Sequence, residues 1–321
     1  MISARWTHDG GHFSINRYEM QGRRPTMEDA ITVAPLRIPH LARPASSDGT
    51  FFGLYDGHGG AGCAIYVAEH LHRQLLSSEA LQRGEVCAAL LDAFAATEST
   101  FFEECESGSG ACALAAVLVG DMLHVAHCGD SRAVLCTGPH SKAVRLTTDH
   151  KPDEPSEQRR IESIGGSVLV RGRCARVTHS NTSMMLATSR SFGDRGFKES
   201  WEAVAAQEAM EAALDAGNAD ELDQAEASDA AGAAPIPPLL SAVPTTLARR
   251  VSAEDKFLIL ACDGVWDVLT DQDACDSVRS ALEQPGAEPE AAARKLVGDA
   301  YRAGSEDNIS ALVAVLHHDL R

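Results

Sequence analysis

Aspartates stand beside glycine or asparagine where apolar runs of this chain begin or end. The pattern recurs as YDGHGG at 55–60, CGDSR at 128–132, ACDG at 261–264 and SEDN at 305–308. A Glu28-Asp29 pair also precedes an apolar run. Carboxylates at strand ends, with glycines that let backbone carbonyls approach, suit a hard divalent cation. Each pair alone is typical of a turn, so the spacing leaves a metal site and a set of unrelated turns both open.

The apolar runs are short, and they alternate with segments of helical periodicity. Runs typical of strands lie at residues 51–55, 113–119, 123–126, 133–135, 184–187, 257–261 and 309–316. Helices are predicted at residues 62–77, 85–102, 154–164, 274–283 and 289–303. Residues 122–136 suggest a hairpin that turns at Gly129-Asp130. Many short strands with covering helices predict an α+β fold of stacked sheets.

The charge balance and the absent signals exclude several classes of protein. The chain has 28 basic and 46 acidic residues, a formal charge of −18, which argues against binding to nucleic acid. No apolar run approaches the ~18–20 residues of a membrane helix. The N-terminal residues lack the apolar stretch of a signal peptide, and the nine cysteines include no C-x-x-C pair. We therefore expect a cytoplasmic monomer with reduced thiols and no membrane partner, the nucleus being the alternative compartment.

The composition changes after Lys198. Residues 199–248 contain no Lys or Arg, whereas residues 199–229 contain ten acidic residues. We interpret about 199–240 as an acidic, alanine-rich insertion within a single domain of residues 1–321, because the Asp-Gly pattern resumes after it. A tolerated surface loop and a segment that selects substrates with basic flanks are both open.

The donor atoms of the expected site are all oxygens. Four or more converging carboxylates could not stay ionised together without cations between them. The chain has no Cys–His pair at the spacing of a zinc ligand set. An all-oxygen donor set therefore favours Mg²⁺ or Mn²⁺ over zinc.

Longer strings carry a family resemblance. They are RPTMED at 24–29, YDGHGG at 55–60, CGDSRAVL at 128–135, TTDHKPDEPSEQRRIESIGG at 147–166, LATSRSFGD at 186–194, LACDGVWDVLTD at 260–271 and SEDNIS at 305–310. In this order they resemble the metal-dependent Ser/Thr protein phosphatases, the PPM or type 2C family, over residues 23 to about 316. The resemblance implies a four-layer αββα sandwich of two antiparallel β-sheets flanked by helices, with two metal ions in a cleft at one end.

The same resemblance implies roles for individual residues at the metal centre. The residues that would bind the ions or hold their waters are Asp56, Gly57, Asp263, Asp307, Glu28 and Asp29. Asp56 would bridge two Mg²⁺ or Mn²⁺ ions, and the backbone carbonyl of Gly57 would bind the second ion. Candidate ligands of a weaker third metal are Asp130 and Asp267, together with Asp263.

The resemblance also implies how a substrate is handled. Arg24 would bind the substrate phosphate, because its planar guanidinium matches phosphate oxygens. His58 would act as the general acid that protonates the leaving Ser or Thr oxygen. The expected reaction is hydrolysis of phosphoserine or phosphothreonine in phosphoprotein substrates by a metal-activated water, without a covalent phosphoenzyme. Two alternatives stay open: a catalytically weak pseudophosphatase that serves as a scaffold, and a hydrolase of small phosphoesters on the same fold.

Overall fold

The apolar runs form two antiparallel sheets whose faces follow the period-two pattern of strands. The computed structural model describes residues 3–8, 11–38, 48–172, 174–178, 185–198, 238–284 and 291–317. The chain divides into two units, the first of residues 1–150, 190–193 and 242–321, and the second of residues 151–189 and 194–241. The expected single domain stays a prediction, and nearly all of the expected acidic insertion lies outside the described residues.

Both sheets belong to the first unit, and all their strand pairs are antiparallel. Sheet A has the order β1, β2, β14, β13, β7, β8, with bounds Ser3–His8, Gly11–Met20, Ile309–His317, Asp255–Ala261, Arg132–Thr137 and Lys142–Arg145. Sheet B has the order β12, β6, β5, β4, β3, with bounds Thr245–Arg250, Met122–Cys128, Gly110–Val119, Asp48–His58 and Ala30–Arg37. The short β11 (Phe192–Gly193) also pairs with β5.

The two sheets share an apolar layer. Leu258 and Leu260 of β13 belong to one buried cluster with Phe52 and Leu54 of β4. These residues alternate along their strands, so one face of each sheet meets the other. Full burial of each such side chain contributes about 1.5–3 kcal/mol to folding.

The outer face of sheet A is covered by helices α8 (Asp271–Leu282) and α9 (Ala291–Arg302). Phe257 and Ile259, the alternate residues of β13, pack with apolar residues of these two helices in a second cluster. Helix α8 begins with a capping box, in which the Thr270 hydroxyl accepts from the Asp273 N–H while the Asp273 carboxylate accepts from the Thr270 N–H. These two hydrogen bonds satisfy backbone N–H groups at the start of the helix that have no partner within it.

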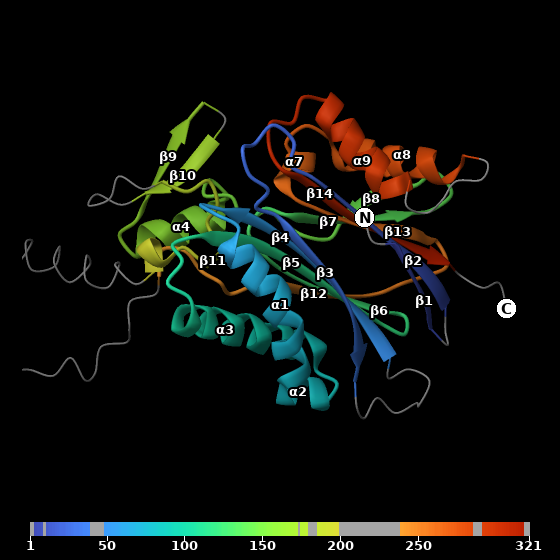
Figure 1. The fold of residues 1–321 in the computed structure, drawn as a ribbon, viewed down its shortest axis with the longest axis horizontal. Helices are drawn as coiled ribbons and strands as arrows, with labels where there is room; N and C mark the ends of the chain where they lie inside the picture. Colours follow the sequence, from blue (N-terminus) through green and yellow to red (C-terminus); the bar gives the residue numbers. More distant parts are fainter. Residues whose placement is uncertain are drawn as a thin grey trace, which may run out of the picture. The chain divides into compact units, whose positions relative to one another are not determined.

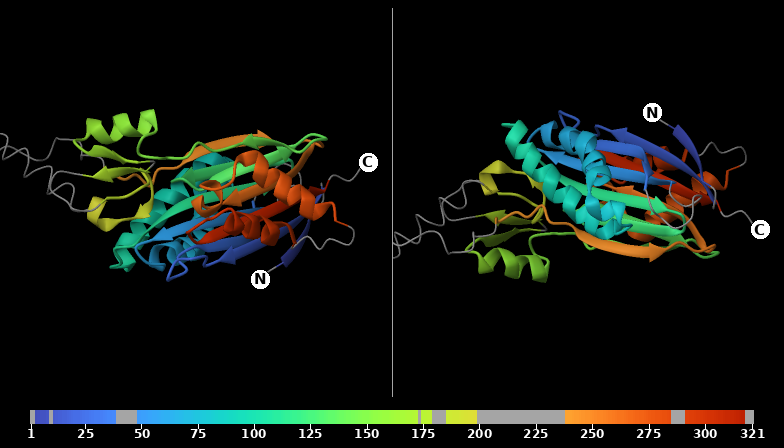
Figure 2. Two further views of the ribbon diagram at one scale, coloured as in Figure 1. Left: turned by 90° about the horizontal axis from the view of Figure 1, so that it is seen from above. Right: turned by 90° about the horizontal axis from the view of Figure 1, so that it is seen from below.

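The outer face of sheet B is covered by helices α1 (Gly62–Ser77), α2 (Glu79–Gln82) and α3 (Val86–Glu104). Phe51 and Tyr55, the alternate residues of β4, are fully buried against them. Figure 1 and the two views of Figure 2 show α8 and α9 on one side of the strands and α1 to α3 on the other. The expected four-layer αββα sandwich is therefore confirmed.

The expected hairpin over residues 122–136 is wrong. Strands β6 and β7 follow one another in the chain, but β6 pairs with β5 and β12 in sheet B, while β7 pairs with β13 and β8 in sheet A. Both edges of each strand are occupied, so neither is left to pair with the other. The Gly129-Asp130 link, with Gly129 at φ 113°, instead carries the chain from one sheet to the other.

The second unit contains α4 (Pro155–Ser163) and a two-stranded sheet of β9 (Ser167–Arg171) and β10 (Cys174–Thr178). The strand expected at residues 184–187 is reduced, in its described part, to an isolated bridge between Leu186 and Val177. These two residues pack in the apolar cluster of this unit.

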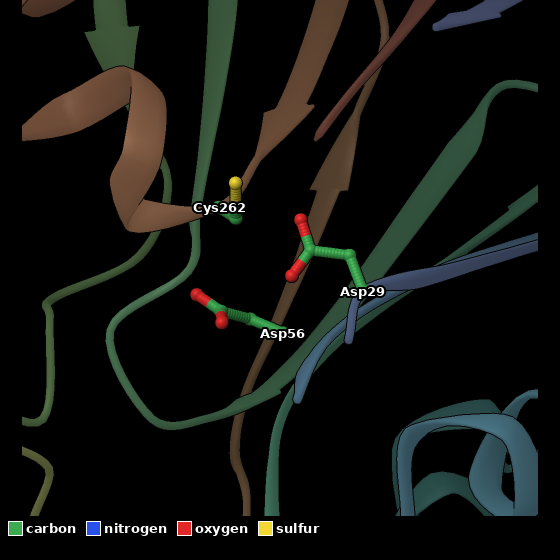
Figure 3. A group of neighbouring side chains, drawn as sticks. All are labelled: Asp29, Asp56 and Cys262. Carbon is green, nitrogen blue, oxygen red and sulfur yellow. The ribbon is translucent and has the colours of Figure 1, made fainter. Parts of the chain in front are cut away.

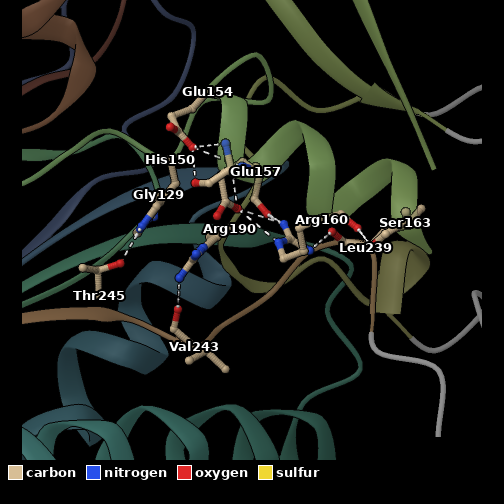
Figure 4. Close-up of polar contacts among 12 residues, drawn as sticks. Gly129, His150, Glu154, Glu157, Arg160, Ser163, Arg190, Leu239, Val243 and Thr245 are labelled. Carbon is tan, nitrogen blue, oxygen red and sulfur yellow. Dashed lines mark hydrogen bonds and ion pairs between the residues drawn. The ribbon is translucent and has the colours of Figure 1, made fainter. Parts of the chain in front are cut away.

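A half-buried arginine holds the second unit together. The Arg160 guanidinium donates to the Glu157 carboxylate at 3.0 Å, to the Ser189 carbonyl at 2.7 Å and to the Leu239 carbonyl at 2.9 Å (Figure 4). Glu157 is 1% exposed, and a buried carboxylate needs partners. Arg160 and the Ser189 hydroxyl, which donates at 2.9 Å, provide them. Hydrogen bonds to charged groups of this kind fix the path of the chain on both sides of the undescribed residues.

A second arginine connects β7 to helix α8 in the first unit. Arg132 lies 2.5 Å from the Asp149 carboxylate and 2.7 Å from the Asp271 carboxylate, and its guanidinium lies 5.0 Å from the centroid of the Trp266 ring. The Arg132 side chain is only 10% exposed. Arg145 also pairs with Asp271 at 2.7 Å.

We expect Arg132→Met to lower the free energy of unfolding by about 3–5 kcal/mol, because it leaves Asp149 and Asp271 without their shared partner in a largely buried place. Urea denaturation measures the change. The control is Arg250→Met, which removes an ion pair to Asp121 whose side chains are 75% and 57% exposed. That variant should lose less than about 1 kcal/mol, and equal losses in the two variants would contradict the account.

Candidate metal centre

Carboxylates from separate segments of the first unit converge on Asp56. Carboxylate oxygens of Asp56, Asp130 and Asp263 lie within 4.8 Å of one another. Asp56 also belongs to a second group, in which its carboxylate, the Asp29 carboxylate and the Cys262 Sγ lie within 4.8 Å of one another (Figure 3). Asp56 is thus the residue that the two groups share.

The members of these groups lie where strands of both sheets begin or end. Asp29 directly precedes β3, and Asp56 is near the end of β4, both in sheet B. Asp130 belongs to the link between β6 and β7. Cys262 and Asp263 follow β13 of sheet A, and Asp263 is the first residue of α7 (Asp263–Trp266). The strands of both sheets therefore begin or end with these polar residues close together, at one rim of the sandwich.

Burial and like charges act together on this rim. Burial raises the pKa of Asp56 well above its usual range, and the negative charges of Asp263, Asp29, Asp130 and Asp307 raise it further. Burial also raises the pKa of Asp29 to about 6. Carboxylates in such a place favour a cation among them, because a divalent ion removes the repulsion that opposes their ionisation. The donor set and its electrostatics thus fit a hard divalent metal.

Asn308 joins the two chain segments that carry the other expected ligands, Glu28 and Asp307. Its amide nitrogen donates to the Gln21 carbonyl at 2.8 Å and to the Thr26 carbonyl at 2.9 Å. Its amide oxygen accepts from the Glu28 N–H at 2.8 Å. Asn308 is 5% exposed. The sequence alone predicted no role for Asn308, although its place in the SEDNIS string beside Asp307 was a signal.

Strand β4 tolerates no side chain at Gly57, its second-last residue. A Cβ at Gly57 would lie 2.2 Å from the Glu28 carbonyl oxygen, so only glycine permits this approach. The Glu28 carboxylate in turn accepts from the Thr26 hydroxyl at 2.8 Å and from the Gly60 N–H at 3.2 Å. These contacts keep Glu28 beside the end of β4.

Arg24 lies at an open cleft next to these acids. Its guanidinium pairs with the Asp307 carboxylate at 2.6 Å, and the Arg24 side chain is 55% exposed. The cleft has a volume of about 700 Å³, and Arg23, Arg24, Asp267 and Asp307 are among its lining residues. Asp267 is exposed and belongs to neither of the compact donor groups found among the described residues.

His58 is the last residue of β4 and is half-buried, with Gly110 of β5 as its strand partner. Asp130 is 5% exposed, and its Oδ1 accepts from the Cys112 thiol at 3.1 Å. The neighbouring Gly129 N–H donates to Nδ1 of the His150 ring, whose Nε2 lies 2.9 Å from the Thr245 hydroxyl (Figure 4). The turn that presents Asp130 is therefore held by side chains.

Comparison with known proteins agrees with this architecture. A family model described as "Protein phosphatase 2C" matches residues 13–309. The chain belongs to the protein phosphatase 2C family. No helix in the described ranges is both long and apolar enough to cross a membrane.

Curated members of the protein phosphatase 2C family resemble nearly the whole chain. "Probable protein phosphatase 2C 76" of Arabidopsis thaliana is 33% identical over 99% of this chain and 62% of that protein. "Probable protein phosphatase 2C 45" of Oryza sativa subsp. japonica is 34% identical over 99% of this chain and 92% of that protein. The chain thus spans less than two thirds of the first relative and most of the second.

A solved structure shows the same fold. The serine-threonine phosphatase 2C of Toxoplasma gondii is similar with a TM-score of 0.73 and 24% sequence identity, over 98% of each chain. At this identity, the likeness supports the arrangement of sheets and helices.

We expect Asp56→Asn to raise the melting temperature of the metal-free protein by about 2–4 °C, corresponding to about 1 kcal/mol, because it removes one of several like charges from a buried place. The melt is measured in EDTA at neutral pH. Asp121→Asn, at an exposed carboxylate, serves as the control and should leave the melting temperature unchanged. A lower melting temperature for Asp56→Asn would mean that the Asp56 carboxylate stabilises the metal-free fold more than its repulsion by the neighbouring acids destabilises it.

Proposed function

We propose that this protein is a metal-dependent protein phosphatase that hydrolyses phosphoserine and phosphothreonine at a dinuclear Mg²⁺ or Mn²⁺ centre. The observation that carries the proposal is the convergence of Asp56, Asp130 and Asp263 at one rim of a protein phosphatase 2C fold. Hard cations prefer such carboxylate oxygens. Phosphate monoesters hydrolyse very slowly in water. Cations held by these carboxylates would accelerate the reaction by neutralising charge on the phosphoryl group.

The residues proposed to hold the metals are those that the sequence predicted. The set comprises Asp56, the Gly57 carbonyl, Asp263 and Asp307, with Glu28 and Asp29 holding bound waters and with Asp130 and Asp267 as candidates for a weaker third ion. When bound, two such cations supply an activated water and neutralise charge on the phosphoryl group. Asn308 supports this set by holding the segment of Glu28 against that of Asp307.

The chain's own residues place the substrate and move its proton. Arg24, exposed at the cleft, can direct N–H groups at phosphate oxygens, while the Asp307 carboxylate accepts from its Nη2 and orients the guanidinium. His58, at the end of β4, is proposed to donate a proton to the leaving Ser or Thr oxygen. The nucleophile is water, so no side chain needs to form a covalent bond with phosphorus.

The direct test is hydrolysis of a phosphothreonine peptide by the full chain. We expect turnover that needs added Mn²⁺ or Mg²⁺, stops in EDTA and returns when metal is restored. Asp263→Asn should lower kcat by about 100-fold or more, because metal catalysis supplies several kcal/mol of charge stabilisation. Asp121→Asn, an exposed carboxylate, should keep full activity.

Turnover that survives chelation would overturn the metal-dependent proposal. No turnover at saturating metal in a folded protein would favour the pseudophosphatase alternative. Faster hydrolysis of small phosphoesters than of any phosphopeptide would favour the remaining alternative.

The acidic segment is proposed to favour substrates with basic flanks. It holds ten acidic residues at 199–229 and no Lys or Arg through residue 248. Opposite charges raise association rates and like charges lower them, which selects among substrates before chemistry begins.

We expect deletion of residues 200–234 to lower the ratio of kcat/KM for basic-flanked over acidic-flanked phosphopeptides by about 10-fold at low salt. A neutral-flanked phosphopeptide provides the control and should be hydrolysed equally by both proteins. The same ratio before and after deletion would show that the segment plays no part in selection.

A further inference from the structure

His150 binds Gly129 through both its backbone and its ring, and Gly129 directly precedes Asp130 in the chain. The His150 N–H donates to the Gly129 carbonyl at 2.9 Å, and the Gly129 N–H donates to Nδ1 of the His150 ring at 3.1 Å. The peptide units on both sides of the Gly129 Cα are therefore bound to one residue. One of these units contains the Asp130 nitrogen, so His150 fixes the direction in which the chain enters Asp130.

The His150 ring is itself held by strand β12 and by a second histidine. Because Nδ1 accepts from a backbone N–H, a neutral ring carries its hydrogen on Nε2 and donates it to the Thr245 hydroxyl at 2.9 Å (Figure 4). The His127 ring stacks on the His150 ring, with the centroids 4.3 Å apart and the planes within 3° of parallel. Nε2 of His127 lies 2.7 Å from the Thr148 carbonyl oxygen. Both rings are buried, so the His150 ring cannot turn freely.

The Asp130 carboxylate needs such support, because it lies among other acids. One of its oxygens lies within 4.8 Å of carboxylate oxygens of Asp56 and Asp263, and like charges this close repel one another. The preceding Gly129 has φ 113°, and a Cβ there would lie 2.3 Å from the Cys112 Sγ. Only glycine fits this position, and glycine gives the backbone no stiffness of its own. Contacts from outside the turn must therefore hold Asp130 in place.

We propose that His150 is a positioning residue for Asp130. Held by Thr245, it keeps the Asp130 carboxylate beside those of Asp56 and Asp263, where the three together bind a divalent cation. His150 acts through Asp130 and is not a ligand itself. The inference rests on the proposed function, because it requires a cation at these carboxylates. Substitution of residues that orient a metal ligand typically lowers metal affinity by about 10–100-fold.

The test is calorimetric titration of the metal-free full chain with Mn²⁺, without substrate. We expect His150→Leu, which removes the Nδ1 acceptor, to weaken binding of at least one Mn²⁺ ion by about 10-fold or more. His150→Asn should recover most of the lost affinity, because its amide oxygen can accept from the Gly129 N–H in place of Nδ1. The control is His124→Leu, which removes a half-buried ring of β6 whose Nδ1 contacts the Cys87 Sγ at 3.5 Å. This control should bind Mn²⁺ as the unsubstituted chain does.

Thr245 provides a second test if His150→Leu does not fold. Thr245 is exposed, so its substitution leaves the apolar core intact. Thr245→Val removes the hydroxyl that accepts from Nε2 of the His150 ring, whereas Thr245→Ser keeps it. We expect Thr245→Val to bind Mn²⁺ more weakly than Thr245→Ser.

Unchanged Mn²⁺ affinity in His150→Leu would overturn the proposal, even if this variant melts at a lower temperature in EDTA, because that pattern indicates a structural role alone. Equal losses in His150→Leu and His150→Asn, or equal affinities of the two Thr245 variants, would also overturn it. If the unsubstituted chain binds no Mn²⁺, the proposed metal centre fails and this inference fails with it. If the unsubstituted chain binds Mn²⁺ and the substitutions have no effect, only the role of His150 fails.

Discussion

Carboxylates that repel one another converge at one rim of this sandwich, and the surrounding contacts must hold them there. Asp56 lies at one rim of the sandwich, where burial together with the neighbouring acids raises its pKa. The apolar clusters of the sandwich stabilise the fold and so offset the cost of placing this carboxylate there. The acids nevertheless stay together because the backbone is held from several sides. Asn308 joins two segments, Gly57 allows close approach, and Arg24 offsets one charge at Asp307. The proposed centre would thus exchange local stability for a place that can bind a cation.

Individual helices and strands could be predicted from local patterns, whereas the four-layer sandwich was expected only from the family resemblance. The helix expected at residues 62–77 has the same bounds as α1, and the expected strands at 257–261 and 309–316 lie within β13 and β14. Both runs are apolar at nearly every position, and successive side chains of a strand point to opposite faces, so both faces of these strands must be buried, as the clusters on either side show. Which strands pair could not be predicted, because β2 pairs with β14 from the other end of the chain and β7 leaves the sheet of β6.

The residues of the candidate site were likewise predicted from short sequence strings, whereas their contacts with segments far away in the chain were not. The strings around Asp56, Asp130 and Asp263 pointed to these residues, and the structure brings their carboxylates together. The part of Asn308 depends on contacts with Gln21 and Thr26, which no local pattern encodes. The cysteines were expected only to be reduced thiols, and the closeness of Cys262 to Asp29 follows from the meeting of two sheets. Sequence strings thus predict which residues matter, and packing decides what each one faces.

These acids are proposed to form a centre for two hard divalent ions. Calorimetric titration of the metal-free protein with Mn²⁺ examines this property without substrate or turnover. We expect saturable binding of two ions per chain, with loss of this binding in Asp56→Asn, since Asp56 is shared by the donor groups. Binding that is absent, or that is the same in Asp56→Asn, would mean that the acids do not form such a centre.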